Sequence, residues 1–129
     1  MTKKTILIAD DEPNIVNLVK IILGKEYRYL EADDGEKVLN LLKKHRPDLI
    51  LLDVMMPKVN GFEICEMLKK DSTLKKIPIA MVSAKAQERD IIQGLRLGAD
   101  YYITKPFDPE RFEMQIKAIL KKAKKNERA

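Results

Sequence analysis

The sequence predicts an α/β protein in three layers, with helices on both faces of a parallel sheet. Five short apolar runs alternate with five segments that carry apolar residues at helical spacing. The helical segments are long enough to serve as right-handed crossovers, which connect the strands of parallel sheets. A chain of 129 residues fits one domain with a sizeable core.

The first strand and helix are marked by their ends. Residues 5–9 form an apolar run that stops at two carboxylates, Asp10 and Asp11. Pro13 is tolerated at the first position of a helix, and the segment after it has an apolar face that Gly24 closes. The first predicted strand therefore ends in acid.

The second unit is more polar. Residues 27–32 mix apolar and charged side chains, as an edge strand does, and a turn follows at 33–35. Apolar residues within 38–42 then predict a short helix that ends before Pro47.

The third unit contains the most informative stretch. Residues 49–52 are all apolar, which is typical of a strand covered on both faces. Asp53 follows directly, and because a buried charge is costly we expect it at the end of the strand, facing a polar cleft. Pro57 and the pair Asn60-Gly61 predict a loop before the next helix.

The second half of the chain repeats the alternation. In order, it predicts a helix at 62–68, a strand at 79–82, a helix at 91–97, a strand at 100–104 and a helix from Pro109. Ser83 follows the fourth strand and Lys105 the fifth. Ligands of such sheets bind outside the carboxyl ends of the strands, so both side chains are candidates for the site of Asp53.

Charge and composition narrow the classes of protein. The net charge is +5, and residues 117–129 carry that whole surplus, with six basic residues and one acid. The body is balanced, without the basic stripe that nucleic-acid binding requires. We divide the chain into a domain at 1–121 and a basic tail at 122–129, which we interpret as a fraying helix end; a linker and a weak electrostatic contact stay open.

Targeting signals and disulfides are not expected. No apolar run approaches a membrane span, and the first residues lead straight into a strand rather than a signal core. Cys65 is the single cysteine, and its helical spacing predicts a packed thiol. We expect a soluble, cytoplasmic protein.

Three carboxylates at one sheet edge predict a metal site. Asp10, Asp11 and Asp53 would repel one another unless a cation intervened. Oxygen ligands without His or Cys favour Mg²⁺. Ser83 can donate a hydrogen bond to a phosphoryl oxygen and Lys105 can supply a positive charge, so the residues predict a phosphoryl pocket with Asp53 as the nucleophile.

The chain resembles a known family over nearly its whole length. The motifs that carry the resemblance are I-A-D-D-E-P, L-D-V-M-M-P followed by N-G, Ser83-Ala84, and L-G-A-D-Y-Y-I-T-K-P-F. They are similar to those of receiver domains in two-component response regulators, the family of the chemotaxis regulators. The resemblance implies a flavodoxin-like sheet in the order 2-1-3-4-5, an arrangement that members of this family share.

The resemblance also implies a role for each site residue. Asp53 would accept a phosphoryl group from a histidine kinase or phosphotransfer protein. Asp11, Asp53 and the backbone carbonyl of Met55 would hold Mg²⁺, with Asp10 assisting through water. The domain would be a phosphoacceptor in a phosphorelay rather than an enzyme.

The switch is implied in the same way. Ser83 would bind the phosphoryl oxygen and move toward it, Lys105 would pair with its charge, and Tyr102 would be the switch aromatic. The Lys105–Pro106 peptide would be cis. Two departures, Ser83 for the commoner Thr and K-V-N-G in the loop, should be tolerated.

The sequence says least about the surface and the partner through which the domain would pass on its signal. We expect phosphorylation to change the surface of the fourth helix, fifth strand and fifth helix, which would contact a second copy or an effector protein. We expect no nucleic-acid or membrane contact by this domain. The sequence leaves open the stimulus, the kinase, the phosphate lifetime and whether an effector domain follows. A haloacid-dehalogenase-like phosphatase is the alternative, but it needs a second Asp where this chain has Met55.

Overall fold

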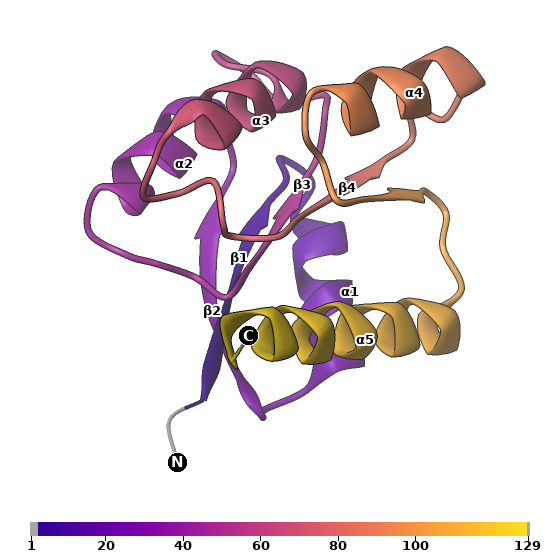
Figure 1. The fold of residues 1–129 in the computed structure, drawn as a ribbon. Coiled ribbons are helices and arrows are strands. Elements are labelled where there is room, and N and C mark those ends of the chain that lie inside the picture. Colours follow the sequence, from indigo (N-terminus) through magenta and orange to yellow (C-terminus); the bar gives the residue numbers. More distant parts are fainter. Residues whose placement is uncertain (1–2, 129) are drawn as a thin grey trace.

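Strands and helices alternate along the whole chain, as the sequence predicts (Figure 1). The computed structural model describes residues 3–128, with side chains through residue 123. The elements are β1 (Lys4–Ala9), α1 (Pro13–Leu23), β2 (Tyr27–Ala32), α2 (Gly35–Leu42), β3 (Leu49–Leu52), α3 (Gly61–Lys70), β4 (Ile79–Ser83), α4 (Glu88–Arg96), β5 (Tyr101–Thr104) and α5 (Pro109–Arg128). The predicted elements differ from these mainly at their ends.

The five strands form one parallel sheet in the order β2-β1-β3-β4-β5, which confirms the order that the resemblance implies. Ala9 at the end of β1 lies opposite Ala32 on one side and Leu52 on the other. The carboxyl ends of the two central strands are therefore level, and the residues after them become neighbours.

Helices cover both faces of the sheet, which gives the predicted three layers (Figure 1). On one face, α1 and α5 pack against the side chains of Ile6, Ile8 and Leu51. On the other face, α2 and α3 pack against strand residues such as Leu7 and Ile50, and α4 lies beside α3 and β5. Burying each such side chain stabilises the fold by about 1.5–3 kcal/mol, so the alternating strand faces anchor both helical layers.

Side chains at the loops fix where the helices begin. Asp34 accepts a hydrogen bond from the backbone of the first turn of α2 at 2.8 Å, and Asn60 does the same for α3 at 3.0 Å. Asp90 closes the start of α4 by accepting from the backbone N–H of Gln87 at 3.1 Å. Because these caps satisfy N–H groups that a helix leaves open, each contributes about 1 kcal/mol.

Two predictions concern regions away from the site. Cys65 is fully buried, as predicted, and burial raises the pKa of its thiol to about 11. Helix α5 continues to Arg128, so the division before residue 122 falls inside a helix and stays a prediction. Among the described helices, none combines the length and apolar character that a membrane crossing needs.

Candidate functional site

Four carboxylates gather at the carboxyl ends of β1 and β3. The backbone N–H of Asp53 donates to Ala9 at 2.9 Å, which places Asp53 beside Asp10 at the ends of paired strands. Both side chains are only 4% exposed. Oxygens of Asp10, Asp11, Glu12 and Asp53 all lie within 4.8 Å of one another. The structure thus brings together the three predicted carboxylates and adds Glu12.

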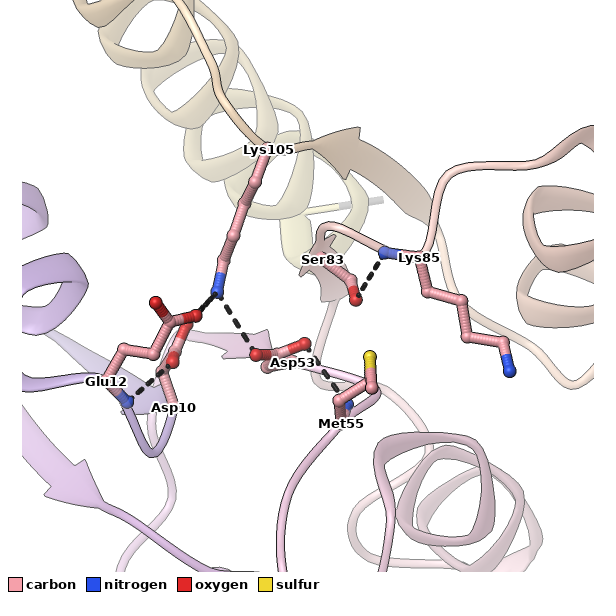
Figure 2. Close-up of polar contacts among 7 residues, drawn as sticks. All are labelled: Asp10, Glu12, Asp53, Met55, Ser83, Lys85 and Lys105. Atoms are coloured by element: carbon pink, nitrogen blue, oxygen red, sulfur yellow. Dashed lines mark hydrogen bonds and ion pairs between the residues drawn. The ribbon is translucent and has the colours of Figure 1, made fainter.

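The Lys105 ammonium lies among these carboxylates (Figure 2). It donates to Asp10 Oδ2 at 2.7 Å, to Asp53 Oδ2 at 3.1 Å and to Glu12 Oε1 at 3.1 Å. Burial opposes the charge on Lys105, but the hydrogen bond to Asp10 and the charges of both aspartates outweigh it, so its pKa is raised. Lys105 therefore supplies positive charge among the carboxylates whose mutual repulsion led us to predict a metal ion.

Burial disfavours the charged form of Asp10 despite its ion pair with Lys105. Burial raises the pKa of its carboxyl above the ordinary value of 3.8, although hydrogen bonds from Lys105 and the backbone of Glu12 oppose that rise. The nearby charge of Asp53 acts in the same direction as burial. Burial therefore outweighs the hydrogen bonds and the nearby ammonium in setting the pKa of Asp10.

The loop after β3 fixes the other oxygen of Asp53. The backbone N–H of Met55 donates to Asp53 Oδ1 at 3.1 Å, while the Met55 side chain is 63% exposed at the mouth of the site. Gly61 lies so close to this strand end that an added Cβ would stand 2.3 Å from the Asp53 carbonyl oxygen. Only glycine fits here, which explains the Asn60-Gly61 pair in physical terms.

Ser83 borders the same site from β4. In Figure 2 the Asp53 carboxylate lies between the group around Lys105 and the Ser83 hydroxyl. The Ser83 side chain is fully buried, and its hydroxyl accepts a hydrogen bond from the backbone N–H of Lys85 at 3.2 Å. The Lys85 side chain points away from the carboxylates, toward Asp90 at 3.9 Å.

Tyr102 connects this loop to α4. Its hydroxyl donates a hydrogen bond to the Lys85 carbonyl, and its ring lies over Gly94, where an added Cβ would be 3.0 Å from the ring. Burial raises the pKa of the Tyr102 hydroxyl. The Lys105–Pro106 peptide is cis, as the resemblance implies.

Sequence reasoning missed three residues of this region. Glu12 was visible as the third acid of D-D-E, but its contact with Lys105 depends on the meeting of two distant loops. Gly94 carried a signal, since a glycine within a helical pattern often marks close packing. Asp90 gave none, because its burial becomes apparent only in the folded chain.

The fold and this edge define an α/β domain with an acidic, lysine-bridged site at the switch point of a doubly wound sheet. Residues 6–117 match the family described as the response regulator receiver domain. The chain therefore belongs to the receiver domain family of two-component response regulators, which are signalling domains. The phosphatase alternative finds no support in this match.

Individual relatives agree with the family. The response regulator GtcR of Aneurinibacillus migulanus is 46% identical over 121 residues, which are 93% of this chain and 49% of that protein. The alkaline phosphatase synthesis transcriptional regulatory protein PhoP of Bacillus subtilis is 44% identical over 121 residues, 93% of this chain and 50% of that protein. The chain thus spans about half the length of these relatives.

A solved structure supports the fold independently. The BeF3-activated DrrB receiver domain superposes with a TM-score of 0.84 at 31% identity, over 93% of this chain and 99% of that one. The flavodoxin-like fold is therefore confirmed at the level of the backbone.

Proposed function

We propose that Asp53 is the phosphoacceptor of a phosphorylation-controlled switch. The observation that carries this is the position of its carboxylate at the end of the central strand β3, with Oδ2 on Lys105, Oδ1 on the Met55 backbone and Ser83 alongside. The Asp53 carboxylate can act as a nucleophile beside a fixed cation and a hydroxyl, which together suit phosphoryl transfer.

The step needs no further reactant than the phosphodonor. An oxygen of Asp53 attacks the phosphorus of a phosphohistidine on a sensor kinase or phosphotransfer protein. The phosphorus–nitrogen bond breaks, and its electron pair leaves with the imidazole, which takes up a proton. An acyl phosphate forms on Asp53, and Lys105 remains beside the added negative charge.

We assign Mg²⁺ to this site as its cofactor. Asp11, Asp53 and the Met55 carbonyl would hold the ion, and Asp10 would assist through water; the four clustered carboxylates fit a hard cation with oxygen ligands. When bound, the ion would neutralise negative charge on the carboxylates and on the incoming phosphoryl group. Asp11 is exposed, so it can turn toward an ion without breaking a buried contact.

Ser83 and Tyr102 would carry the signal away from Asp53. The Ser83 hydroxyl already faces Asp53 in Figure 2 and would turn from the Lys85 N–H to a phosphoryl oxygen. Lys85 is also the residue whose carbonyl receives the Tyr102 hydroxyl. A movement of this loop would therefore release or retain Tyr102, and phosphate would shift the equilibrium by its preference for one arrangement.

The output surface would be formed by α4, β5 and α5. Ile92, Leu95 and Met114 are large apolar side chains exposed on these helices, at 40%, 46% and 72%. A second copy of the chain or an effector protein would cover them. The domain would work in the cytoplasm, either alone or as part of a longer regulator, and it would bind neither nucleic acid nor membrane through this surface.

Intact mass spectrometry with acetyl phosphate tests the proposal. We expect wild type to gain the mass of one phosphoryl group in the presence of Mg²⁺ and Asp53→Asn to gain none. Asp33→Asn is the matched control, because Asp33 is an exposed aspartate whose ion pair is to Lys37. Labelling of Asp53→Asn at the wild-type rate would show that another residue is the acceptor.

A further inference from the structure

A basic cleft opens at the opposite edge of the sheet from the acidic site. Its volume is about 1100 Å³, and residues at the amino ends of four strands contribute to it: Lys4, Asp48, Pro78 and Asp100. Six basic residues line it, namely Lys4, Arg46, Lys69, Lys75, Lys76 and Lys122. We call this feature the basal cleft.

The two acids of the basal cleft are already engaged by the fold. Asp48 Oδ2 accepts from the backbone N–H of Thr5 at 2.8 Å. Asp100 Oδ2 accepts from the backbone N–H of Ile79 at 2.8 Å and from Lys69 at 3.1 Å. The lining therefore has six basic residues against these two acids, so positive charge is in excess.

Most of the cleft's cationic groups have no ion-pair partner among the described side chains. Among the side chains described, through residue 123, no carboxylate lies within ion-pair distance of the cleft's basic residues other than Lys69. The pKa of Asp71 is lowered chiefly by hydrogen bonds from Thr73, and the charge of Arg46 contributes least to that shift. The cleft therefore carries a concentrated positive charge.

One lysine holds the wall of the cleft in place. The Lys69 ammonium donates to the carbonyls of Lys75 at 3.1 Å and Ile77 at 3.0 Å, and its side chain is only 17% exposed. These bonds fix the backbone that carries Lys75 and Lys76. The two exposed ammonium groups are thus presented on an ordered loop, which lowers the entropic cost of binding.

The lining also has an apolar part. Pro47, Ile77 and Leu120 are buried residues that reach the cleft, and the ring of Tyr101 is half-buried there. The site is concave, has both apolar and cationic walls, and is slightly larger than the roughly 300–1,000 Å³ of most ligand pockets, so it has room for a small organic anion.

We propose that the basal cleft binds a ligand that carries a chain of phosphates, either a nucleoside triphosphate or inorganic polyphosphate. Clustered lysines supply point charges to successive phosphates, and Arg46 can bind phosphate oxygens in pairs. In a nucleotide the base would lie on Tyr101 and the apolar wall. The site stands apart from Asp53, so it does not depend on the function proposed above.

Calorimetric titration of the full chain with ATP and with tripolyphosphate, both without Mg²⁺, tests the proposal. We expect saturable binding of at least one probe, with backbone NMR shifts concentrated at residues 73–78 and 119–123. Lys75→Glu/Lys76→Glu should weaken binding by at least about tenfold. Tighter binding of ATP than of tripolyphosphate identifies the nucleotide as the source of the phosphates, and equal binding identifies the chain of phosphates alone.

The control has the same change of charge outside the cleft. Arg89→Glu/Arg111→Glu alters two exposed arginines in the first turns of α4 and α5, at the carboxyl ends of the strands, and should leave affinity within about twofold of wild type. Equal losses in both variants would reduce the effect to net charge and overturn the proposal. No binding of either probe, or tighter binding of a short DNA duplex than of both, would overturn it as well.

Discussion

Lys105 determines the electrostatics of the acidic edge at the scale of a single residue. Its side chain is 7% exposed, and it contacts two carboxylates that are buried as deeply. Burying a charge without a partner costs several kcal/mol, so each aspartate tolerates its position because the ammonium is there. The sequence predicted a charge for an incoming phosphoryl group but not this contact.

Replacing Lys105 should destabilise the protein markedly. Lys105→Met leaves Asp10 and Asp53 facing each other, and we expect a loss of about 3 kcal/mol in the free energy of unfolding. Urea unfolding at pH 7 measures it. Because the pKa of Lys105 is raised in the fold, its contribution is fully present below the ordinary value of 10.5 and is lost only as the pH rises through the folded value.

A surface lysine provides the matched control for that variant. Lys70 pairs with Glu66 at 2.9 Å on the exposed face of α3, and Lys70→Met should cost less than about 1 kcal/mol. Similar losses in the two variants would show that the buried contacts of Lys105 contribute no more than a solvated ion pair.

At the scale of elements, the pattern of the sequence determined most of the fold. The unbroken apolar run of β3 was too short for an independent helix and typical of a strand covered on both faces. Pro13 and Pro109 marked the first residues of α1 and α5 correctly. The packing of Tyr102 on Gly94 was beyond such reasoning. That contact depends on how α4 lies against β5, and hydrophobic periodicity gives the face of a helix but not its position along a strand.

The contact between Gly94 and Tyr102 can be measured with a double-mutant cycle. Alanine is a better helix former than glycine by about 1 kcal/mol, so Gly94→Ala should deliver that gain in a Tyr102→Ala background. In wild type the new Cβ would crowd the ring at 3.0 Å, and we expect the gain to shrink or change sign. Urea unfolding of the four proteins gives the coupling; no difference between backgrounds would mean that the ring moves aside freely.

At the scale of the whole molecule, the sheet separates two oppositely charged edges. The acidic site lies at the carboxyl ends of the strands and the basal cleft at their amino ends. Position along the strands made the acidic site predictable, because Asp10, Asp53 and Lys105 each follow a strand directly and Ser83 ends one. The basal cleft could not be predicted from the sequence, because its basic residues are scattered from residue 4 to residue 122.

Magnesium should stabilise the whole domain if it binds as proposed. At a Mg²⁺ concentration about ten times the dissociation constant, we expect the free energy of unfolding to rise by about 1.4 kcal/mol. Thermal unfolding with and without Mg²⁺ measures this gain. Asp11→Ala should abolish the gain. The effect should also shrink as the pH falls toward the pKa of Asp10, which burial raises above 3.8, because a protonated carboxyl no longer attracts the ion. Unchanged midpoints in tens of millimolar Mg²⁺ would remove the ion from the site.

Because the ribosome makes the chain from its amino terminus, the ion pairs of Lys105 can form only late in synthesis. Lys105 follows Asp10 by 95 residues and Asp53 by 52. At roughly 5–20 residues per second, a nascent chain therefore waits about 3–10 s between Asp53 and the lysine that compensates it. During that time, pairing of β1 with β3 would bring the two aspartates together without their counter-charge. We expect the two central strands to gain full stability only when β5 and the loop after it have left the ribosome.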